Sequence, residues 1–225
     1  MAMTRIDLSQ QYTNEMPRFP GMEAPQIDLL AQVEVHGFGM ERLHMTTHLG
    51  THTDFGAHLA LGGKKRQDYT PRDLWVDDAQ VIHFPGHKGA ITLAEMAPHL
   101  SRARPGGVVL IATGHSAAWG SPAYYQNNPY LEREAAQALI DRRILAIGFD
   151  GPSADPVGEE EPTGADDFPL HQLWLGAGCL ILENLTHLQE LPDQVELVIG
   201  AINIRDATGI PSAIWAKFAT ESLLS

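Results

Sequence analysis

Four histidines and one aspartate fall within residues 44–58, and this run restricts the possible folds more than any other feature of the chain. Imidazole and carboxylate groups are ligands that suit zinc, manganese or iron. No cysteine lies nearby, which favours a catalytic over a structural metal site. All five positions have the same parity, so an extended strand would point them to one face. They are His44, His48, His52, Asp54 and His58.

A straight strand would nevertheless hold His48 and His52 too far apart for one ion, since four extended residues span about 13 Å. A helix would bring the two together, but the intervening threonines and Gly50 are poor helix formers. We therefore predict a bend at Gly50–Thr51, where glycine can adopt a backbone conformation that is closed to most residues. The bend would let His48, His52 and Asp54 share a cation.

Three ligands leave coordination positions open, as a catalytic metal requires. Such an ion acidifies water and polarises a carbonyl, while hydrolysis of an amide also needs a proton for the leaving nitrogen. His58 is the candidate proton carrier; the alternatives are a further ligand or a histidine that hydrogen-bonds a ligand. For His44, a buried strand position is favoured over a hydrogen bond to a ligand.

His171 and Glu183 stand out later in the chain, although their spacing alone leaves open whether either binds metal. Glu183 directly follows an apolar run, and burying a carboxylate is costly unless it is paired or bound to a cation. An aromatic group after His115 could line a substrate pocket or cap a barrel. Three tryptophans are expected in the core. The aromatic group comprises Trp119, Tyr124, Tyr125 and Tyr130, and the tryptophans are Trp75, Trp174 and Trp215.

Short apolar runs alternate with helix-like spacing in the second half of the chain. Four runs predict buried strands, and residues 131–143 predict a helix. We expect one α/β domain over residues 1–225, with a mixed, barrel-like sheet and helices packed outside. The polar stretch 155–167 predicts an exposed loop, more typical of a surface insertion than of a lid. The four strands are expected at 108–112, 144–149, 179–182 and 195–204.

The formal net charge of −13 argues against nucleic acid or an anionic membrane as the main partner. The single cysteine, Cys179, excludes an internal disulfide and lies in an apolar run, which favours a buried thiol. The N-terminal residues lack the apolar core of a signal peptide, and no stretch approaches the length of a membrane span. We therefore expect a cytoplasmic protein.

Residues 48–58, HLGTHTDFGAH, resemble the hallmark H-x-G-T-H-x-D-x-P-x-H of the metal-dependent cyclase-family hydrolases, which include bacterial kynurenine formamidases and isatin hydrolases. Gly56 replaces the proline of that pattern. The likeness extends to D-L-S at 7–9, M-P-x-x-P-G at 16–21, G-x-D-x-P-S-x-D at 148–155, and to His171 and Glu183 of the E-N-L segment. Phe19 stands where the formamidases have tryptophan, and the chain has P-S-A at 211–213 where the family often has P-V-R.

The resemblance implies a role for each matched residue. His48, His52 and Asp54 would hold one metal; Asp54 would bridge to a second, completed by His171 and Glu183. His58 would be the general acid/base, and Phe19 would contact substrate. The implied cofactor is zinc or manganese, one or two ions per chain. The implied fold is a swivelling β/β/α domain, usually in dimers or tetramers.

Together these observations predict a hydrolase of a small amide, cyclic amide or N-formyl C–N bond. The specific alternative is a kynurenine formamidase, which converts N-formylkynurenine to kynurenine and formate. The alternative from another class is a protein that binds a metal or small molecule without catalysis.

Overall fold

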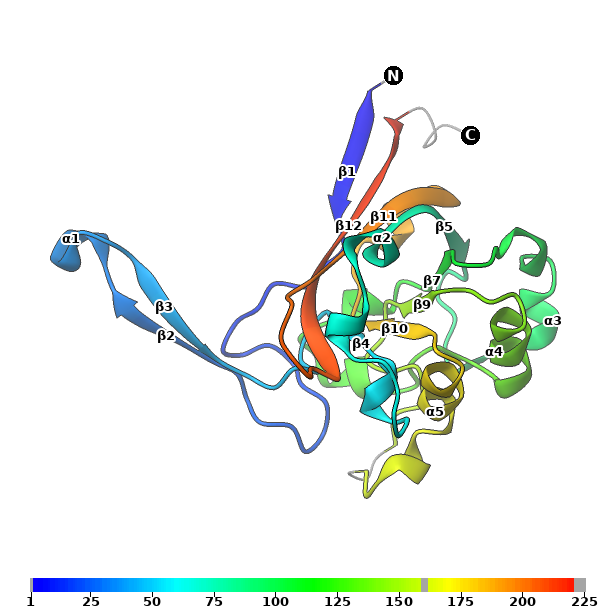
Figure 1. The fold of residues 1–225 in the computed structure, drawn as a ribbon, viewed down its shortest axis with the longest axis horizontal. Helices are drawn as coiled ribbons and strands as arrows, with labels where there is room; N and C mark the ends of the chain where they lie inside the picture. The colour runs from blue at the N-terminus through cyan, green and yellow to red at the C-terminus, as the bar shows by residue number, and fades with distance from the viewer. Residues whose placement is uncertain (1, 159–161, 221–225) are drawn as a thin grey trace.

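Seven strands close into a barrel in this computed structural model, which describes residues 2–158 and 162–220 (Figure 1). The order around the ring is β12-β11-β5-β7-β9-β10-β4, and β4 pairs with β12 to close it. The first strand, β1 (Met3–Asp7), adds to the outer part of β12. The ring strands are β4 (His52–Asp54), β5 (Trp75–His83), β7 (Val108–Ala112), β9 (Ala146–Phe149), β10 (Leu180–Glu183), β11 (Gln194–Ala201) and β12 (Gly209–Ala219).

Parallel and antiparallel pairs both occur in the ring. Strands β5, β7, β9 and β10 run parallel to one another, whereas β4, β11 and β12 form antiparallel pairs with each of their neighbours in the ring. This confirms the mixed, barrel-like sheet predicted from the sequence. The parallel strands are buried on both faces, which explains why they read as continuous apolar runs rather than as alternating patterns.

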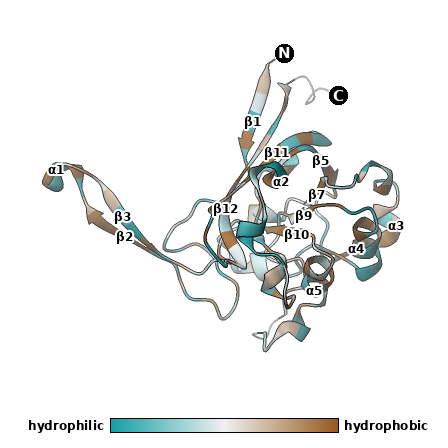
Figure 2. Cartoon of the chain, viewed as in Figure 1, coloured by the Kyte–Doolittle hydropathy of each residue, from teal (hydrophilic) through white to brown (hydrophobic). Residues whose placement is uncertain are grey.

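Two apolar clusters use the two faces of these strands. Leu110 and Leu182 belong to the cluster inside the barrel, while Ile111 and Ile147 belong to the cluster that the strands share with α4 (Arg133–Ile140) and α5 (Pro169–Gly176). In Figure 2, brown hydrophobic segments lie on strands of the ring and on α4. Trp174 is fully buried in the outer cluster, as predicted. The other described α-helices are α1 (Val33–His36), α2 (Pro71–Leu74) and α3 (Leu93–Met96). None of the helices in the described residues has the length and apolar character needed to cross a membrane.

Two small sheets lie outside the ring. The hairpin of β2 (Gln26–Ala31) and β3 (Met40–His44) projects away from the barrel, and β6 (Ala90–Ile91) pairs with β8 (Tyr130–Leu131). The pairing of Leu131 with Ile91 explains why α4 begins at Arg133 instead of Leu131.

Several expectations about burial are wrong. His44 is exposed on β3, with its Nε2 3.9 Å from Glu23, because β3 belongs to the hairpin that projects from the barrel. Trp75 and Trp215 are 56% and 45% exposed on the outer face of the ring, where no helix covers them among the described residues. Asp155, assigned to an exposed loop, is fully enclosed.

Candidate metal centre

The segment before β4 bends sharply, and Gly50 makes the bend possible. Its φ of +61° lies in the left-handed region, and a Cβ there would come within 2.7 Å of the side chains of Met16 and Tyr12. The Tyr12 hydroxyl donates to the carbonyls of Leu49 and Thr51, at 2.9 and 2.6 Å. The predicted bend at Gly50–Thr51 is therefore confirmed, and it turns His48 back toward β4.

Asn184, which directly follows β10, stabilises the same bend through hydrogen bonds. Its side-chain Nδ2 donates to the Gly50 carbonyl at 2.9 Å, and its backbone carbonyl accepts from Thr51 Oγ1 at 2.7 Å. The buried Tyr124 hydroxyl donates to Asn184 Oδ1 at 2.9 Å. This network fixes the position of the Gly50 carbonyl, which is the acceptor for the next residue of the site.

His52 and His171 use their ring nitrogens in the same way. His52 Nδ1 donates to the Gly50 carbonyl at 2.9 Å, and His171 Nδ1 donates to Asp155 Oδ2 at 2.6 Å. Each Nε2 consequently turns toward the same two carboxylates. His52 Nε2 lies 3.3 Å from Asp54 and 3.5 Å from Glu183, while His171 Nε2 lies 3.5 Å and 3.1 Å from them.

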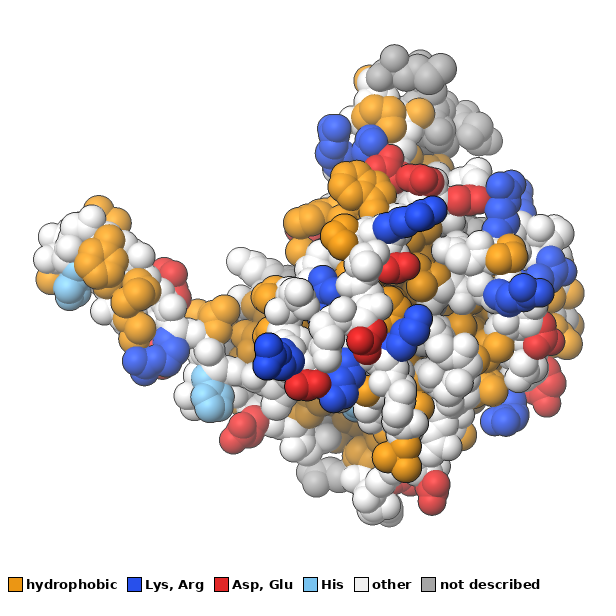
Figure 3. Space-filling model, in the orientation of Figure 1, with side chains coloured by type: hydrophobic (Ala, Val, Ile, Leu, Met, Phe, Trp, Pro, Cys, Tyr) orange, Lys and Arg blue, Asp and Glu red, His pale blue; other side chains and the backbone are white. Residues whose placement is uncertain are grey.

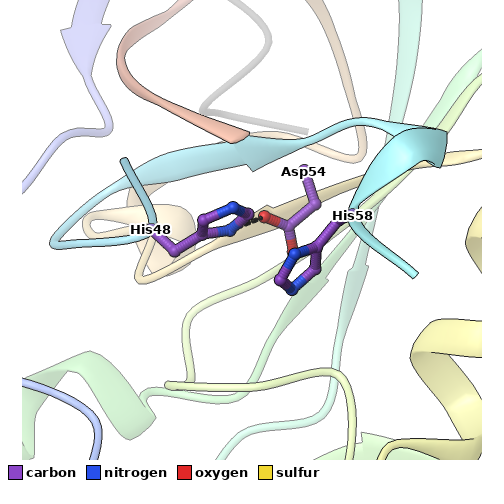
Figure 4. Close-up of side chains that lie close together, drawn as sticks. All are labelled: His48, Asp54 and His58. Carbon is purple, nitrogen blue, oxygen red and sulfur yellow. Dashed lines mark hydrogen bonds and ion pairs between the residues drawn. The ribbon is translucent and has the colours of Figure 1, made fainter. Parts of the chain in front are cut away.

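His48 and His58 complete the cluster around Asp54 (Figure 4). His48 Nδ1 lies 2.7 Å from Asp54 Oδ1, and its ring stacks on that of His58 with centroids 3.9 Å apart. His58 lies on a 3-10 helix, η1 (Gly56–His58), directly after β4. The structure thus brings together all six residues that the sequence analysis assigned to metal binding or proton transfer.

Burial and charge alter the acidity of these groups in opposite directions. Burial lowers the pKa of His52, but Asp54, Glu183 and the Gly50 carbonyl together outweigh it and raise the pKa to about 9. The pKa of His171 also rises well above its usual value, because Glu183, Asp155 and Asp54 outweigh its burial. Burial is the main reason why the pKa of His58 falls to about 4.

The donor set fits a divalent cation. Asp54 Oδ2 is completely buried and has no hydrogen-bond partner among the described residues. A buried carboxylate oxygen without a partner is costly, and a cation would satisfy it. Two sets of three side chains, His48–Asp54–His58 and His52–Asp54–Glu183, place their ligand atoms within 4.8 Å of one another. Histidine nitrogens oriented by a second acceptor are typical of metal ligands.

Sequence reasoning missed several residues that support this centre. The pattern at 148–155 includes Asp155 but does not indicate that this residue accepts from His171, which follows only from the fold. Gly209 carried no signal, yet a Cβ there would lie 2.2 Å from Cε1 of His48. The absence of a side chain at Gly209 therefore makes room for the His48 ring.

A cavity of about 520 Å³ opens directly onto the cluster. One wall is aromatic: Phe19 contacts Tyr125 edge-on and Phe168 at a tilt, with ring centroids 6.2 and 6.1 Å apart. Phe19 and Tyr125 thus lie where substrate could reach them. Residues 162–165 also line the cavity, so the interpretation of 155–167 as a plain surface insertion is wrong for this part of the stretch. Residues 159–161 lie outside the described residues.

Fold and site together define a barrel protein with a buried histidine–carboxylate cluster suited to a divalent cation. The sequence profile of the family described as putative cyclase matches residues 6–156, and the chain belongs to that family. The match includes His48 to His58 and Asp155, and it ends before His171 and Glu183.

Similar proteins agree with this assignment. The kynurenine formamidase of Bacillus cereus is 28% identical over 207 residues, covering 92% of this chain and 93% of the relative. Isatin hydrolase A from Ralstonia solanacearum shares the fold, with a TM-score of 0.84 and 20% identity over 96% of this chain and 92% of that one. A predicted metal-dependent hydrolase from Bacillus stearothermophilus superimposes with a TM-score of 0.74 at 21% identity, covering 96% and 99% of the two chains.

Proposed function

We propose that this protein is a metal-dependent hydrolase of a C–N bond in a small amide, cyclic amide or N-formyl compound. One observation carries the proposal: His52 and His171 are oriented by separate acceptors so that both turn Nε2 toward Asp54 and Glu183. The formamidase name of the Bacillus cereus relative, which aligns over most of both chains, supports this reaction class.

In this proposal His48, His52 and Asp54 hold one cation, zinc or manganese. Asp54 also reaches toward His171 and Glu183, which would hold a second. A divalent cation there supplies Lewis acidity, which polarises a carbonyl and lowers the pKa of water. The chain itself contributes the orientation of the ligands, because the acceptors at Gly50 and Asp155 fix both imidazoles before any ion arrives.

We assign proton transfer to His58. Its ring lies against His48 and lines the cavity, so it can reach a substrate that enters from the aromatic side. The lowered pKa leaves His58 neutral at pH 7, and it can therefore accept a proton from water. The same nitrogen can then pass this proton to the leaving nitrogen, which departs as a neutral amine.

The cavity favours a substrate with a flat ring. Phe19, Tyr125 and Phe168 offer faces and edges on which an aromatic ring can pack, and the volume suits a small organic molecule. N-formylkynurenine, the substrate of the specific alternative, carries such a ring beside its formamide. We therefore propose an amide on an aromatic ring as the substrate class.

A substrate panel tests the reaction class. The metal-free protein, prepared with a chelator, would be supplied with zinc or manganese and offered N-formylkynurenine, isatin and simple cyclic imides. We expect turnover of at least one compound, and its loss when the metal is removed again. No turnover of any compound with either metal would contradict the proposal.

The His58→Ala variant tests the proton carrier. Because His58 is assigned to proton transfer, the variant should keep its metal while turnover falls by roughly 10²–10⁴-fold. Elemental analysis and steady-state kinetics on the same sample give both readings. Loss of metal would make His58 a ligand instead, and unchanged activity would remove it from the mechanism. A protein that only binds its ligand would show no turnover in either form.

A further inference from the structure

Arg18 is the only Lys or Arg residue that lines the cavity within the described residues. The carboxylates there, Asp54 and Glu183, belong to the candidate metal centre. Arg18 stands at an open position of the M-P-x-x-P-G pattern, so the family resemblance assigns it no role. The proposed function does not use it either. A single guanidinium at the edge of an aromatic cavity therefore needs an explanation of its own.

A turn at residues 18–22 holds the Arg18 side chain in place. Its Nε donates to the Met22 carbonyl at 2.9 Å, and the Met22 N–H donates to the Phe19 carbonyl at 3.1 Å. Neither Nη group forms an ion pair or hydrogen bond with another part of the described chain. A guanidinium has five N–H donors, so four remain for a ligand once Nε is bound.

The positive charge of Arg18 lies beside the aromatic wall of the cavity. Arg18 directly precedes Phe19, and both residues, with Tyr125, also line an adjoining hollow of about 510 Å³. Burial and the Glu183 carboxylate raise the pKa of Tyr125, whereas the nearby charge of Arg18 counteracts this rise. A ring packed on Phe19 would therefore hold its substituents within reach of the guanidinium.

The charge of the chain otherwise disfavours an anionic substrate. The formal net charge is −13, and on the face seen in Figure 3 Lys and Arg side chains lie scattered among Asp and Glu side chains. An anionic compound is therefore repelled as it approaches, and only a local cation can offset that repulsion at close range. Arg18 is exposed and supplies this cation at the edge of the cavity.

We propose that Arg18 binds a carboxylate on the aromatic ring of the substrate, away from the amide, which must reach the metal centre. This inference rests on the proposed function and narrows its substrate class to aryl amides with a negatively charged substituent. The planar guanidinium matches a planar carboxylate through two parallel N–H···O bonds. This contact is made equally in the bound substrate and in the transition state, so it lowers KM and leaves kcat unchanged.

Matched substrate pairs test the proposal with the full-length, metal-loaded protein. The 3- and 4-formamidobenzoates carry a carboxylate that cannot reach the same metal as their formamide. The corresponding formamidobenzamides are neutral and similar in size. The test variant is Arg18→Met, which keeps an unbranched side chain without the charge. Arg142→Met is the control, because Arg142 is also exposed but follows α4 and does not line the cavity.

We expect the unchanged protein to prefer at least one carboxylate over its carboxamide in kcat/KM. Arg18→Met should reduce this preference about tenfold through KM, as for one solvent-exposed charge-assisted pair, and Arg142→Met should retain it. No preference in the unchanged protein, or one that Arg18→Met leaves intact, would overturn the proposal. An equal loss for both members of a pair would also overturn it, because Arg18 would then only hold the turn.

Isothermal titration calorimetry separates this proposal from the proposed function. If none of the four compounds is hydrolysed, hydrolysis of aryl formamides is contradicted, but their binding still tests Arg18. The preferred carboxylate should bind the unchanged protein more tightly than its carboxamide, and Arg18→Met should reduce that difference about tenfold. Equal affinities, or no binding of any of them, would overturn the role of Arg18 whether or not turnover occurs.

Discussion

At the scale of single residues, the candidate centre depends on groups that never touch the cation position. His171 is oriented by Asp155, whose two oxygens also accept from the backbone N–H groups of Leu170 and His171 at the start of α5. One carboxylate therefore fixes both the helix end and the ring that the helix carries.

Replacing Asp155 by Asn tests its bond to the His171 ring separately from its bond to the start of α5. The amide has one accepting oxygen, which can still accept from the Leu170 N–H in place of Oδ1, whereas the NH2 group in place of Oδ2 cannot accept the Nδ1 proton of His171. We expect metal affinity to fall by roughly 10–100-fold, as for other residues that orient a metal ligand. Competition with a metal-sensitive chelator measures this change. Asp166→Asn, an exposed change in the same stretch, should leave the affinity unaltered.

Gly209 provides a second test at this scale. Since a Cβ would lie 2.2 Å from Cε1 of His48, the Gly209→Ala variant must displace the ring from Asp54. We expect a loss of metal affinity of about tenfold or more, by the same reasoning that applies to misplaced ligands. Gly176→Ala is the control, because a Cβ there meets nothing within 4 Å. Equal affinities for the two variants would show that His48 is not a ligand.

At the scale of elements, the site is built where β10, the bend before β4 and the segment around Tyr124 meet. Asn184 links all three through its side chain, and it does so with a left-handed backbone, φ +58°. Asparagine tolerates this conformation better than most residues, which explains its position directly after the strand.

The Asn184→Gly variant removes these side-chain bonds without adding backbone strain. The Tyr124 hydroxyl loses its buried acceptor, so unfolding should become easier by about 1–3 kcal/mol. Urea denaturation measures the difference. Asn127→Gly is matched to it, since Asn127 also has a positive φ, of 50°, but is exposed. A similar stability for the two variants would contradict the role of the network.

The elements differ in how far the sequence alone predicts them. The strand at 108–112 coincides with β7, because a run buried on both faces carries a signal that needs no partner to be recognised. The strand predicted at 195–204 ends instead at Ala201, and the projecting hairpin of β2 and β3 was not predicted at all. Its apolar side chains alternate too weakly to distinguish a projecting hairpin from a piece of the barrel.

The same contrast applies to the site. His48, His52, Asp54 and His58 could be predicted together because one short run contains them all. From spacing alone, His171 and Glu183 could not be assigned, since their approach to Asp54 depends on how β10 pairs with β4 and how α5 packs. The resemblance to a family supplied what the local pattern lacked. Nothing in the sequence marked Gly209, whose role is to leave space.

At the scale of the whole molecule, two histidines with raised pKa values make stability depend on pH. In the metal-free protein, protonated His52 and His171 balance the buried carboxylates of Asp54 and Glu183. The folded pKa of His52, about 9, lies above its unfolded value of 6.5. The stabilisation is therefore complete below pH 6.5 and is lost as the pH rises through about 9.

We accordingly expect the metal-free protein to lose stability between pH 6.5 and 9, whereas a bound cation should replace the protons and remove this loss. Urea denaturation at several pH values, with chelator or with zinc, would measure both curves. Parallel curves would mean that protons and metal do not compete for these imidazoles.

The pairing of β4 with β12, which closes the barrel, also determines when metal can bind. Strand β4, which carries His52 and Asp54, is held on one edge by β10 and on the other by Gly209 to Pro211 of β12. While the polypeptide is still being synthesised, its early histidines have left the ribosome long before the residues that lock them in place. We therefore expect metal to bind only after β12 (Gly209–Ala219) has formed, and a product truncated before this strand would carry all of the assigned ligands without the pairing that holds β4 in place.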